Sequence, residues 1–443
     1  MNKQIRENWI ELAIIVISFI DLFVNVIPPV PLAAFSLLLL FLRLDVLGII
    51  LICVFAAPKL AGAIFLSYNI PGIGGALILI PPLLVVFECF LTKKLNFTKL
   101  NKVLPALLLL FGYMLVSSIF MGLEWSWSKL LSTIINGVVA LLAYTTIFSN
   151  YQKCNFVRTG LYFLIISVLL LLLSPIFNHG SGPENLLDFG YLRVQNNMFG
   201  DEEVSRIIEY QQVGFIAVLG LGTIMLEEFK GEINSLFLFI VMQISTFASL
   251  YAGARQFFVV SLLLIVIWTL FGKKGKIAKF VIPLFSFLFV VLLVLVLFSS
   301  EGLLNNVLTD GYLEASKRED HINQGLKDFF GSPVFGIGYG CFKLGGQYGS
   351  YPHNLIVELL GELGLVGFLL FFIPLIRPTW AIVTKIRPCF YLMVVYFMRA
   401  MASGGLDTNI IFFCYVLASY TLYVKKSSLL NNKNNNIILN AYE

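Results

Sequence analysis

An all-α protein that crosses a membrane many times is the fold class that the sequence predicts, and three observations support it. The chain has 443 residues, of which 58% are hydrophobic and only 12% are charged, and its mean hydropathy is +0.89. Soluble domains are about 45–50% apolar and about 25% charged, so this composition is that of an integral membrane protein. Apolar runs of about 20 residues, enough to cross a bilayer as a helix, recur along the chain. We therefore expect one integral membrane domain over residues 1–443.

About fourteen apolar runs have the length of a transmembrane helix. The first run follows a charged N-terminus, but no small-residue cleavage site comes after Phe23, so we interpret it as a span and not as a signal peptide. The shortest of the runs are 28–42 and 388–401. The expected helices lie near residues 9–27, 28–42, 45–66, 72–92, 103–121, 129–149, 158–177, 207–226, 232–250, 254–271, 279–299, 355–376, 388–401 and 406–424.

Basic residues set the expected orientation, because cytoplasmic loops of membrane proteins carry an excess of Lys and Arg. Three connections are crowded with such residues: Lys93, Lys94, Lys99 and Lys102; Lys273, Lys274, Lys276 and Lys279; and Arg377, Lys385 and Arg387. All three lie on the cytoplasmic side if both termini do, which is the topology we expect. Basic loops of this kind account for the pI near 8.7 without a nucleic-acid partner.

Two connections on the outer side are much longer than the others, residues 178–206 and residues 300–353. Long loops among short ones usually carry a function or are disordered. All three histidines, His179, His321 and His353, lie in these two loops. Half of the arginines lie outside or near the outer face: Arg193, Arg206, Arg255, Arg318 and Arg399. Because the planar guanidinium binds phosphate and carboxylate through several hydrogen bonds, this distribution points to an anionic ligand.

Neither a metal site nor a redox site is indicated by the sequence. The six cysteines are scattered, mostly in apolar runs, and form no Cys-x-x-Cys pair, so we interpret them as small buried hydrophobic residues. The three histidines are widely spaced, and the carboxylates near them form no ligand pattern. We therefore expect no metal and no other cofactor.

Two arginines at the edge of the membrane have a structural interpretation beside a functional one. Arg255 follows the small residues Ala-Gly-Ala at the outer end of a span, where a ligand can come close. The alternative is a side chain that snorkels to the interface. Arg399 lies within a predicted span, and Asp407 follows beyond a Ser-Gly-Gly break. A structural salt bridge between these two residues is slightly favoured over a role in substrate binding.

The arginines within the long loops are also open to two interpretations. Residues 315–321 have the pattern of a short amphipathic helix that lies on the membrane, and Arg318 belongs to this segment. Arg193 lies in a similar setting in the first long loop. Each can bind a ligand or belong to a solvated charged face, since exposed ion pairs are common and weak.

Three alternating glycines, Gly336, Gly338 and Gly340, follow Pro333 in the second long loop. Glycine permits positive φ angles and a close approach of other backbone. A run of this kind cradles phosphate where it leads directly into a helix or strand, but here the predicted helix begins later. We therefore expect these glycines to shape a loop.

His353 lies immediately before the helix that follows this loop. Asn354 has the character of the helix N-cap. The positive end of the helix dipole disfavours an imidazolium next to it, so a neutral ring that can take a proton is expected. The alternative is a histidine that bonds to nearby backbone. Glu358 and Glu362 follow one helical turn apart, and Glu358 is close enough to orient a neighbouring group.

These motifs together resemble the signature of the O-antigen ligase and polymerase superfamily. The motifs are Pro333-x-x-Gly336-x-Gly338-x-Gly340-x-Phe342, then Pro352-His353-Asn354, then Glu358-Leu-Leu-Gly-Glu362-Leu-Gly364-Leu-x-Gly367, with Ala252-Gly-Ala-Arg255 upstream. The resemblance covers about residues 250–370, and the first 180 residues are similar only in hydropathy. The Pro-His-Asn element with its Gly-Leu-x-Gly helix is the most specific part.

The resemblance implies a GT-C-type membrane glycosyltransferase whose donor is an oligosaccharide linked to undecaprenyl diphosphate. Arg255 and Arg318 would hold the diphosphate, and His353 would be the base or would position the acceptor. The reaction would invert the anomeric carbon by direct displacement and would need no metal. Contacts to the substrate are expected from a second set of residues: Arg193, Gly338, Asn354, Glu358 and Arg399.

Three functions stay open within this interpretation. A polymerase of lipid-linked repeat units, which builds O-antigen or capsular polysaccharide, is favoured by the Asn- and Lys-rich tail and the large number of spans. A ligase that transfers the polymer to lipid A core is the alternative, and a flippase for lipid-linked oligosaccharide is a third. The expected place is the bacterial inner membrane, with the site on the periplasmic side. The expected partners are the lipid-linked donor and acceptor, the bilayer and, for a polymerase, a chain-length regulator.

Overall fold

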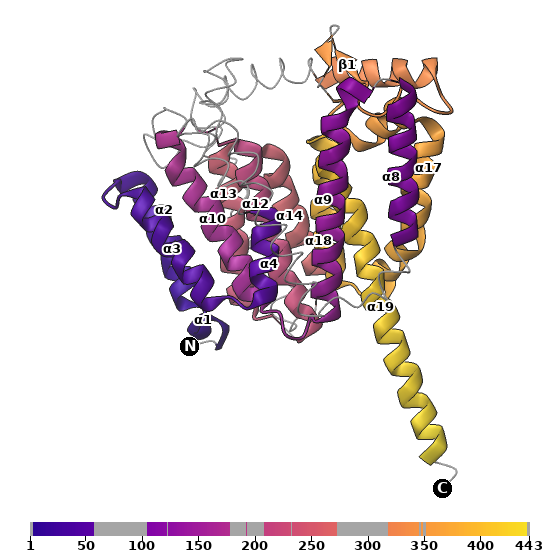
Figure 1. The fold of residues 1–443 in the computed structure, drawn as a ribbon. Helices are drawn as coiled ribbons and strands as arrows, with labels where there is room; N and C mark the ends of the chain where they lie inside the picture. Colours follow the sequence, from indigo (N-terminus) through magenta and orange to yellow (C-terminus); the bar gives the residue numbers. More distant parts are fainter. Residues whose placement is uncertain are drawn as a thin grey trace. The chain divides into compact units, whose positions relative to one another are not determined.

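The computed structural model describes residues 3–56, 104–121, 123–177, 192, 208–231, 233–272, 318–344, 347–348 and 351–440. These residues are almost entirely helical, which confirms an all-α membrane protein (Figure 1). Within them, six helices are long and apolar enough to cross a membrane, and five shorter apolar helices accompany them. Eleven of the fourteen expected runs contain one of these helices, and run 9–27 contains a further helix, Trp9–Val24, whereas runs 72–92 and 279–299 lie outside the described residues. The number of spans therefore stays a prediction.

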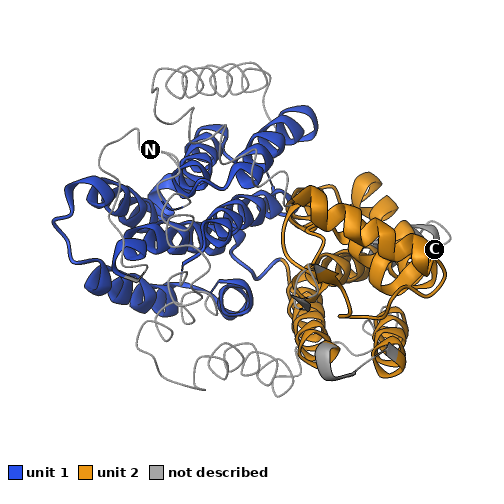
Figure 2. Cartoon of the chain, turned by 90° about the horizontal axis from the view of Figure 1, so that it is seen from above, with its two compact units in different colours: residues 1–85, 152–312 blue, residues 86–151, 313–443 orange. Residues whose placement is uncertain are grey.

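The chain divides into two compact units, and each is assembled from two separate stretches of sequence (Figure 2). Unit 1 consists of Met1–Val85 and Gln152–Tyr312, and unit 2 consists of Val86–Tyr151 and Leu313–Glu443. The two units are described separately below.

Unit 1 is built around helix α10, which is almost completely buried. α10 packs against α2, α3, α4, α12 and α13. Two glycines, Gly160 of α10 and Gly220 of α12, let these helices approach so closely that an added Cβ atom on Gly160 would lie 2.5 Å from the Gly220 carbonyl oxygen. The elements of unit 1 are α1 (Lys3–Glu7), α2 (Trp9–Val24), α3 (Pro29–Arg43), α4 (Val46–Phe55), α10 (Phe156–Phe177), α12 (Tyr210–Met225), the 3-10 helix η2 (Leu226–Phe229), α13 (Ser235–Ala252) and α14 (Arg255–Phe271).

A charged group at one end of unit 1 ties three of these helices together. The Glu11 carboxylate of α2 is fully buried, and Arg43 of α3 reaches it with Nε at 2.7 Å and Nη2 at 3.3 Å. The Nε atom of Arg158, from α10, lies 3.3 Å from the same carboxylate. Both guanidinium groups also donate to backbone carbonyls, among them that of Glu7. We call Glu11, Arg43 and Arg158 the Glu11 cluster.

Unit 2 contains the second long loop and the helices around it. α19 packs against α9, α17 and α18, and α8 packs against α9 and α17. A two-residue antiparallel hairpin pairs Lys343 with Tyr348, and residues 318–331 form a helix. The elements are α8 (Leu104–Met121), α9 (Leu123–Ser149), β1 (Lys343–Leu344), β2 (Gln347–Tyr348), α17 (Leu355–Thr384), α18 (Pro388–Ala402) and α19 (Leu406–Asn440).

The second long loop has more regular structure than its sequence suggests. The helix over residues 318–331 includes Arg318, so the expected short helix is present over the part of it that the structure describes. In Figure 1 this helix, in orange beside β1, runs across the direction of α8, α9 and α17. The first long loop, residues 178–206, lies outside the described residues except for Leu192.

Candidate functional site

The site in unit 2 starts from a break inside α17. At Gly364 the backbone has φ 63° and ψ −166°, a conformation that strongly favours glycine and that interrupts the helix. The N–H groups of Leu365 and Val366 can no longer reach the carbonyls one turn earlier. They donate instead to the backbone carbonyls of Pro333 and Val334, at 2.9 and 3.1 Å. These two residues begin the segment 333–340, which contains Gly336, Gly338 and Gly340 and which we call the glycine loop.

The glycine loop returns the hydrogen bonds that the break leaves open. Ile337 N–H donates to the Gly361 carbonyl at 3.0 Å, and Gly338 N–H donates to the Glu362 carbonyl at 2.9 Å. Gly336 has φ 73°, and a Cβ atom there would lie 2.4 Å from the Glu362 carbonyl oxygen. The glycines thus shape a loop that fits the broken helix, as expected from the sequence. We call this set of backbone hydrogen bonds between residues 333–338 and α17 the loop seam.

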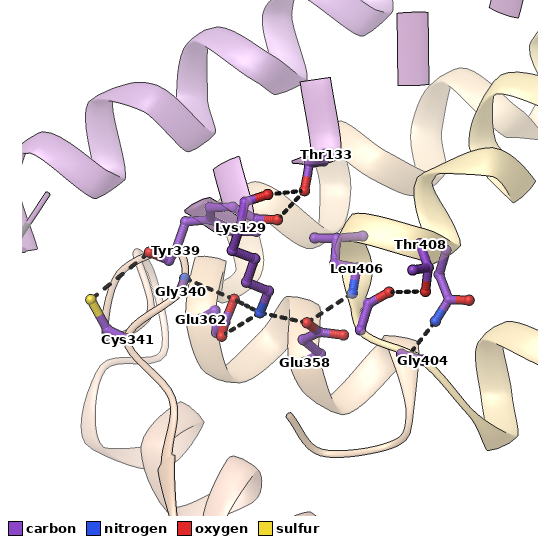
Figure 3. Close-up of polar contacts among 12 residues, drawn as sticks. Lys129, Thr133, Tyr339, Gly340, Cys341, Glu358, Glu362, Gly404, Leu406 and Thr408 are labelled. Atoms are coloured by element: carbon purple, nitrogen blue, oxygen red, sulfur yellow. Dashed lines mark hydrogen bonds and ion pairs between the residues drawn. The ribbon is translucent and has the colours of Figure 1, made fainter. Parts of the chain in front are cut away.

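A buried ion cluster lies next to Gly340, two residues after the loop seam (Figure 3). The ammonium group of Lys129, from α9, contacts two carboxylates of α17. Its Nζ atom lies 2.7 Å from Glu358 Oε1 and 2.8 Å from each oxygen of Glu362. Both glutamates are almost completely buried. We call Lys129, Glu358 and Glu362 the Lys129 cluster.

The two glutamates of the cluster differ in their hydrogen bonds to residues other than Lys129. Glu362 Oε2 also accepts a hydrogen bond from Gly340 N–H at 3.1 Å, and Glu358 Oε1 accepts one from Leu406 N–H at 2.9 Å. Glu358 Oε2 is buried and has no hydrogen-bond partner among the described residues. The cluster therefore connects the glycine loop and the start of α19 to α17, and it leaves one acceptor unused.

The helix over residues 318–331 is held against the start of α17 by glycine contacts. A Cβ atom on Gly325 would lie 2.6 Å from a methyl carbon of Val357, and one on Gly361 would lie 2.9 Å from the Gly325 carbonyl oxygen. Arg318 and His321 precede Gly325 by seven and four residues, so the three share one face of the helix. This packing brings Arg318 and His321 to the residues just before α17.

His353 lies at the meeting point of these elements. Its ring centroid is 4.4 Å from that of Tyr351 and 5.1 Å from that of His321. Its φ of 55° is uncommon for a residue with a side chain, a feature that functional sites often show. The Nδ1 atom is buried and has no hydrogen-bond partner among the described residues. The sequence left open that His353 bonds to nearby backbone, and its Nδ1 atom makes no such bond to the described residues.

The His353 ring is held in its neutral form. Burial, the positive charge of Arg318 and the nearby His321 lower the pKa of His353 from 6.5 to about 4. A neutral ring was expected from the sequence, where the helix dipole was the argument. In the structure, burial is the largest cause.

Asn354 is the N-cap of α17, as predicted. Its side-chain oxygen accepts hydrogen bonds from the N–H groups of Ile356 at 3.0 Å and Val357 at 3.2 Å. Its side-chain nitrogen donates to the Met401 carbonyl at the end of α18, at 3.5 Å. The cap thus fixes the residue directly after His353 to two helices of unit 2.

The other predicted site residues are distributed between the units. Arg318, like His353, belongs to unit 2, and its guanidinium has no hydrogen-bond or ion-pair partner among the residues that the structure describes. Arg399 lies half-buried in the last turn of α18, close enough to Tyr396 to act on it electrostatically. Arg255 is the first residue of α14 in unit 1, and Arg193 lies outside the described residues. A site that Arg255 shares with Arg318 and His353 stays a prediction.

Three residues near this site were not selected from the sequence: Lys129, His321 and Tyr351. His321 shares a helix face with Arg318, a spacing that could have indicated its position. The Glu358 and Glu362 pair on an apolar helix signals that a counter-charge is needed. No sequence signal identifies Lys129 as that charge, because it comes more than 200 residues earlier in the chain.

No group of three or more His, Cys, Asp or Glu residues suited to a metal occurs in the part of the chain that the structure describes. The reaction that needs no metal stays a prediction.

Comparison with known proteins gives one result on the family. The family model described as O-Antigen ligase matches residues 236–372. This segment includes α13, α14, the helix over residues 318–331, the glycine loop and α17 beyond its break. No curated protein matches the chain. Arg255, Arg318 and His353 all lie within the matched segment, and the match supports the O-antigen ligase and polymerase superfamily.

Proposed function

We propose that this chain is an inverting, metal-independent glycosyltransferase of the GT-C type. It polymerises undecaprenyl-diphosphate-linked repeat units into O-antigen or capsular polysaccharide at the periplasmic face of the inner membrane. The observation that carries the proposal is the convergence of Arg318, His321 and His353 at the start of α17, inside the matched segment.

The chemistry of this reaction requires a cation beside the leaving group. An undecaprenyl diphosphate gains negative charge as the glycosidic bond breaks, and a guanidinium stabilises that charge through paired hydrogen bonds. Arg318 supports this role, because its guanidinium is not engaged by any described residue and lies near His353. Arg255 is proposed as the second guanidinium on the diphosphate.

The acceptor is a sugar hydroxyl, and His353 is proposed as the base that receives its proton. A neutral imidazole with an unused nitrogen can accept a proton from a hydroxyl at hydrogen-bond distance. Attack of the hydroxyl oxygen on the anomeric carbon then expels the diphosphate on the opposite side, which inverts the configuration. Five further residues are proposed to form the substrate-binding part of the site: Arg193, Gly338, Asn354, Glu358 and Arg399.

A ligase is the second candidate, because the matching family model is described as O-Antigen ligase. A ligase and a polymerase differ in the acceptor: lipid A core for the first and a new lipid-linked repeat unit for the second. Deletion of the gene, with surface polysaccharide separated on a gel, distinguishes them. A single repeat on the core in the deletion strain, restored to a ladder by the gene, supports the polymerase. Loss and recovery of all polymer on the core supports the ligase.

The residue roles are tested with purified protein in nanodiscs and lipid-linked repeat units extracted from the deletion strain. We expect Arg318→Ala, Arg255→Ala and His353→Ala to lower the rate of polymer formation about 100-fold or more, as loss of one transition-state contact does. Lys327→Ala is the matched control, since it removes an exposed positive charge from the same helix as Arg318. Full polymer formation by the His353 and Arg255 variants would contradict the proposal.

A further inference from the structure

The Lys129 cluster carries an excess of negative charge in a buried place. Two carboxylates of α17 share one ammonium group at 2.7 and 2.8 Å. A third carboxylate is nearby, since Asp407 and Glu358 both border the space next to the Cα atom of Gly405. In a low-dielectric interior, one uncompensated carboxylate gains strongly from taking up a proton.

Glu358 Oε2 is the atom of the cluster that is best placed to take up such a proton. Every oxygen of Glu362 is engaged by Lys129, and Oε2 also accepts from Gly340. Glu358 Oε1 is engaged by Lys129 and by Leu406 N–H. Of the four carboxylate oxygens in the Lys129 cluster, only Glu358 Oε2 is buried without a hydrogen-bond partner among the described residues. A buried oxygen of this kind normally has a hydrogen bond, so this one is available for a proton.

A short path leads from His353 toward this carboxylate. A Cβ atom on Gly405 would lie 3.5 Å from Cγ of Tyr351 and 3.4 Å from Glu358 Oε1. Tyr351 in turn packs on His353, with ring centroids 4.4 Å apart. Gly405 has no side chain to separate Tyr351 from Glu358, and the third neighbour of this place is Asp407 Oδ1, 2.7 Å from the Cβ position.

From this geometry we infer that Glu358 is the final acceptor of the proton that the acceptor hydroxyl releases. The inference rests on the proposed function. The hydroxyl oxygen forms the new bond to the anomeric carbon, and the bond from that carbon to the diphosphate breaks, with its electron pair leaving on the diphosphate. His353 takes the hydroxyl proton and passes it to Glu358, so that His353 returns to its neutral form and the Lys129 cluster becomes neutral.

Two features favour Glu358 as the final proton acceptor. Burial and the charge of Arg318 lower the pKa of His353, so a protonated His353 releases its proton near neutral pH. The charged and titratable groups that face Glu358 are Lys129 of α9, Glu362 of α17, Asp407 of α19, and Tyr339 and Tyr351 of the loops. Only one of these five, Lys129, is a cation, so the proton is not repelled from the carboxylate.

The first experiment measures where the proton is held, and it does not depend on activity. Infrared spectra of the full chain in nanodiscs are recorded as the pH is lowered, and the carbonyl band of a protonated buried carboxylic acid is followed. We expect Glu358→Gln to remove this band and Glu362→Gln to retain it. A band that persists in the Glu358→Gln protein would overturn the inference.

The second experiment measures the rate of polymer formation against pH. We expect Glu358→Gln to lower kcat by about 100-fold with little change in KM, the usual effect of losing a proton acceptor. The amide keeps the size of the side chain and its acceptor for Leu406 N–H. We also expect the decline of kcat at low pH to disappear in this variant. An unchanged pH profile would contradict the role, whereas an inactive wild-type protein would instead contradict the proposed function.

The third experiment closes the space at Gly405. Gly405 does not have a positive φ, so its backbone accepts an alanine, whose methyl group displaces Asp407 Oδ1, 2.7 Å away, and narrows the space between Tyr351 and Glu358. We expect Gly405→Ala to lower kcat about tenfold with unchanged KM. Gly112→Ala is the matched control, because nothing lies within 4 Å of a Cβ atom there. Equal kcat in the two variants would overturn the path through this space.

Discussion

Among the residues that the structure describes, each unit holds a buried charge cluster, and these two clusters have opposite compositions. The Glu11 cluster of unit 1 places two guanidinium groups around one carboxylate, whereas the Lys129 cluster of unit 2 places two carboxylates around one ammonium. Arg43 contacts both Glu11 oxygens, while Glu358 Oε2 has no partner among the described residues. The surplus charge also differs in access to water, since the arginines are partly exposed and both glutamates of α17 are buried.

This difference separates a cluster that fixes helices from one that can change its protonation. Surplus guanidinium groups at a partly exposed place remain charged and reach backbone carbonyls or solvent. Surplus carboxylate in a dry place has only a proton to neutralise it. The predictions below test this contrast, in order of decreasing effect.

The largest effect is expected from Lys129→Met. This change leaves two buried carboxylates without a counter-ion, which typically costs about 3–5 kcal/mol. The free energy of unfolding in mixed detergent micelles is the measurement. The double variant Lys129→Met/Glu358→Gln carries one carboxylate fewer and should recover part of the loss. If the double variant is no more stable than the single one, repulsion between the carboxylates is not the cause.

A smaller effect is expected from Glu11→Gln in unit 1. The glutamine retains a hydrogen-bond acceptor for Arg43, so we expect a loss of about 1–3 kcal/mol in the free energy of unfolding. Turnover per folded molecule should stay unchanged, because this cluster only joins helices. Reduced kcat at equal folded concentration would show that the Glu11 cluster has a part in the reaction.

Two equivalent N-cap asparagines, one in each unit, allow the effect on stability to be separated from the effect on the reaction. Asn354 caps α17 and Asn234 caps α13, and each side chain accepts hydrogen bonds from the N–H groups two and three residues later. Replacement of either by alanine should cost about 1 kcal/mol in stability. Only Asn354→Ala should also lower the rate of polymer formation, because it releases the residue next to His353. Equal rates in the two variants would mean that the cap does not position His353.

At neutral pH the smallest effect on stability is that of His353, and it grows as the pH is lowered. The unfolded chain protonates His353 as the pH falls through 6.5, whereas the folded protein resists until about pH 4. Between these values the unfolded state binds more protons, so His353 makes the protein less stable as the pH falls. We expect the melting temperature of His353→Gln to fall less steeply over this window than that of the wild type. Parallel curves would show that His353 is not held neutral.

The positions of the helices could be predicted from hydropathy, since helices of sufficient length are the usual way to bury an apolar run in a bilayer. The N-cap at Asn354 could also be predicted, because capping is decided by neighbouring residues. The break at Gly364 could not, since glycine inside an apolar helix usually remains helical. It occurs here because a distant loop satisfies the freed backbone groups.

The candidate site was predictable only in part, for a similar reason. Arg318 and His353 belong to sequence motifs, and the helix over residues 318–331 brings Arg318 close enough to His353 to act on it electrostatically. Lys129 is separated from Glu358 by more than 200 residues and carries no motif of its own. Ion pairs of this kind depend on which helices pack together, and hydropathy does not determine that.

The loop seam has a consequence for how this protein can evolve. It joins the glycine loop to α17 almost entirely through backbone atoms, and backbone atoms are the same whatever the side chain. Val334 and Phe335 of this loop are 50% and 61% exposed. Mutation can therefore exchange these side chains while the loop stays in register with the broken helix. For the proposed glycosyltransferase, this means that the loop surface can be re-shaped for a different sugar without being rebuilt.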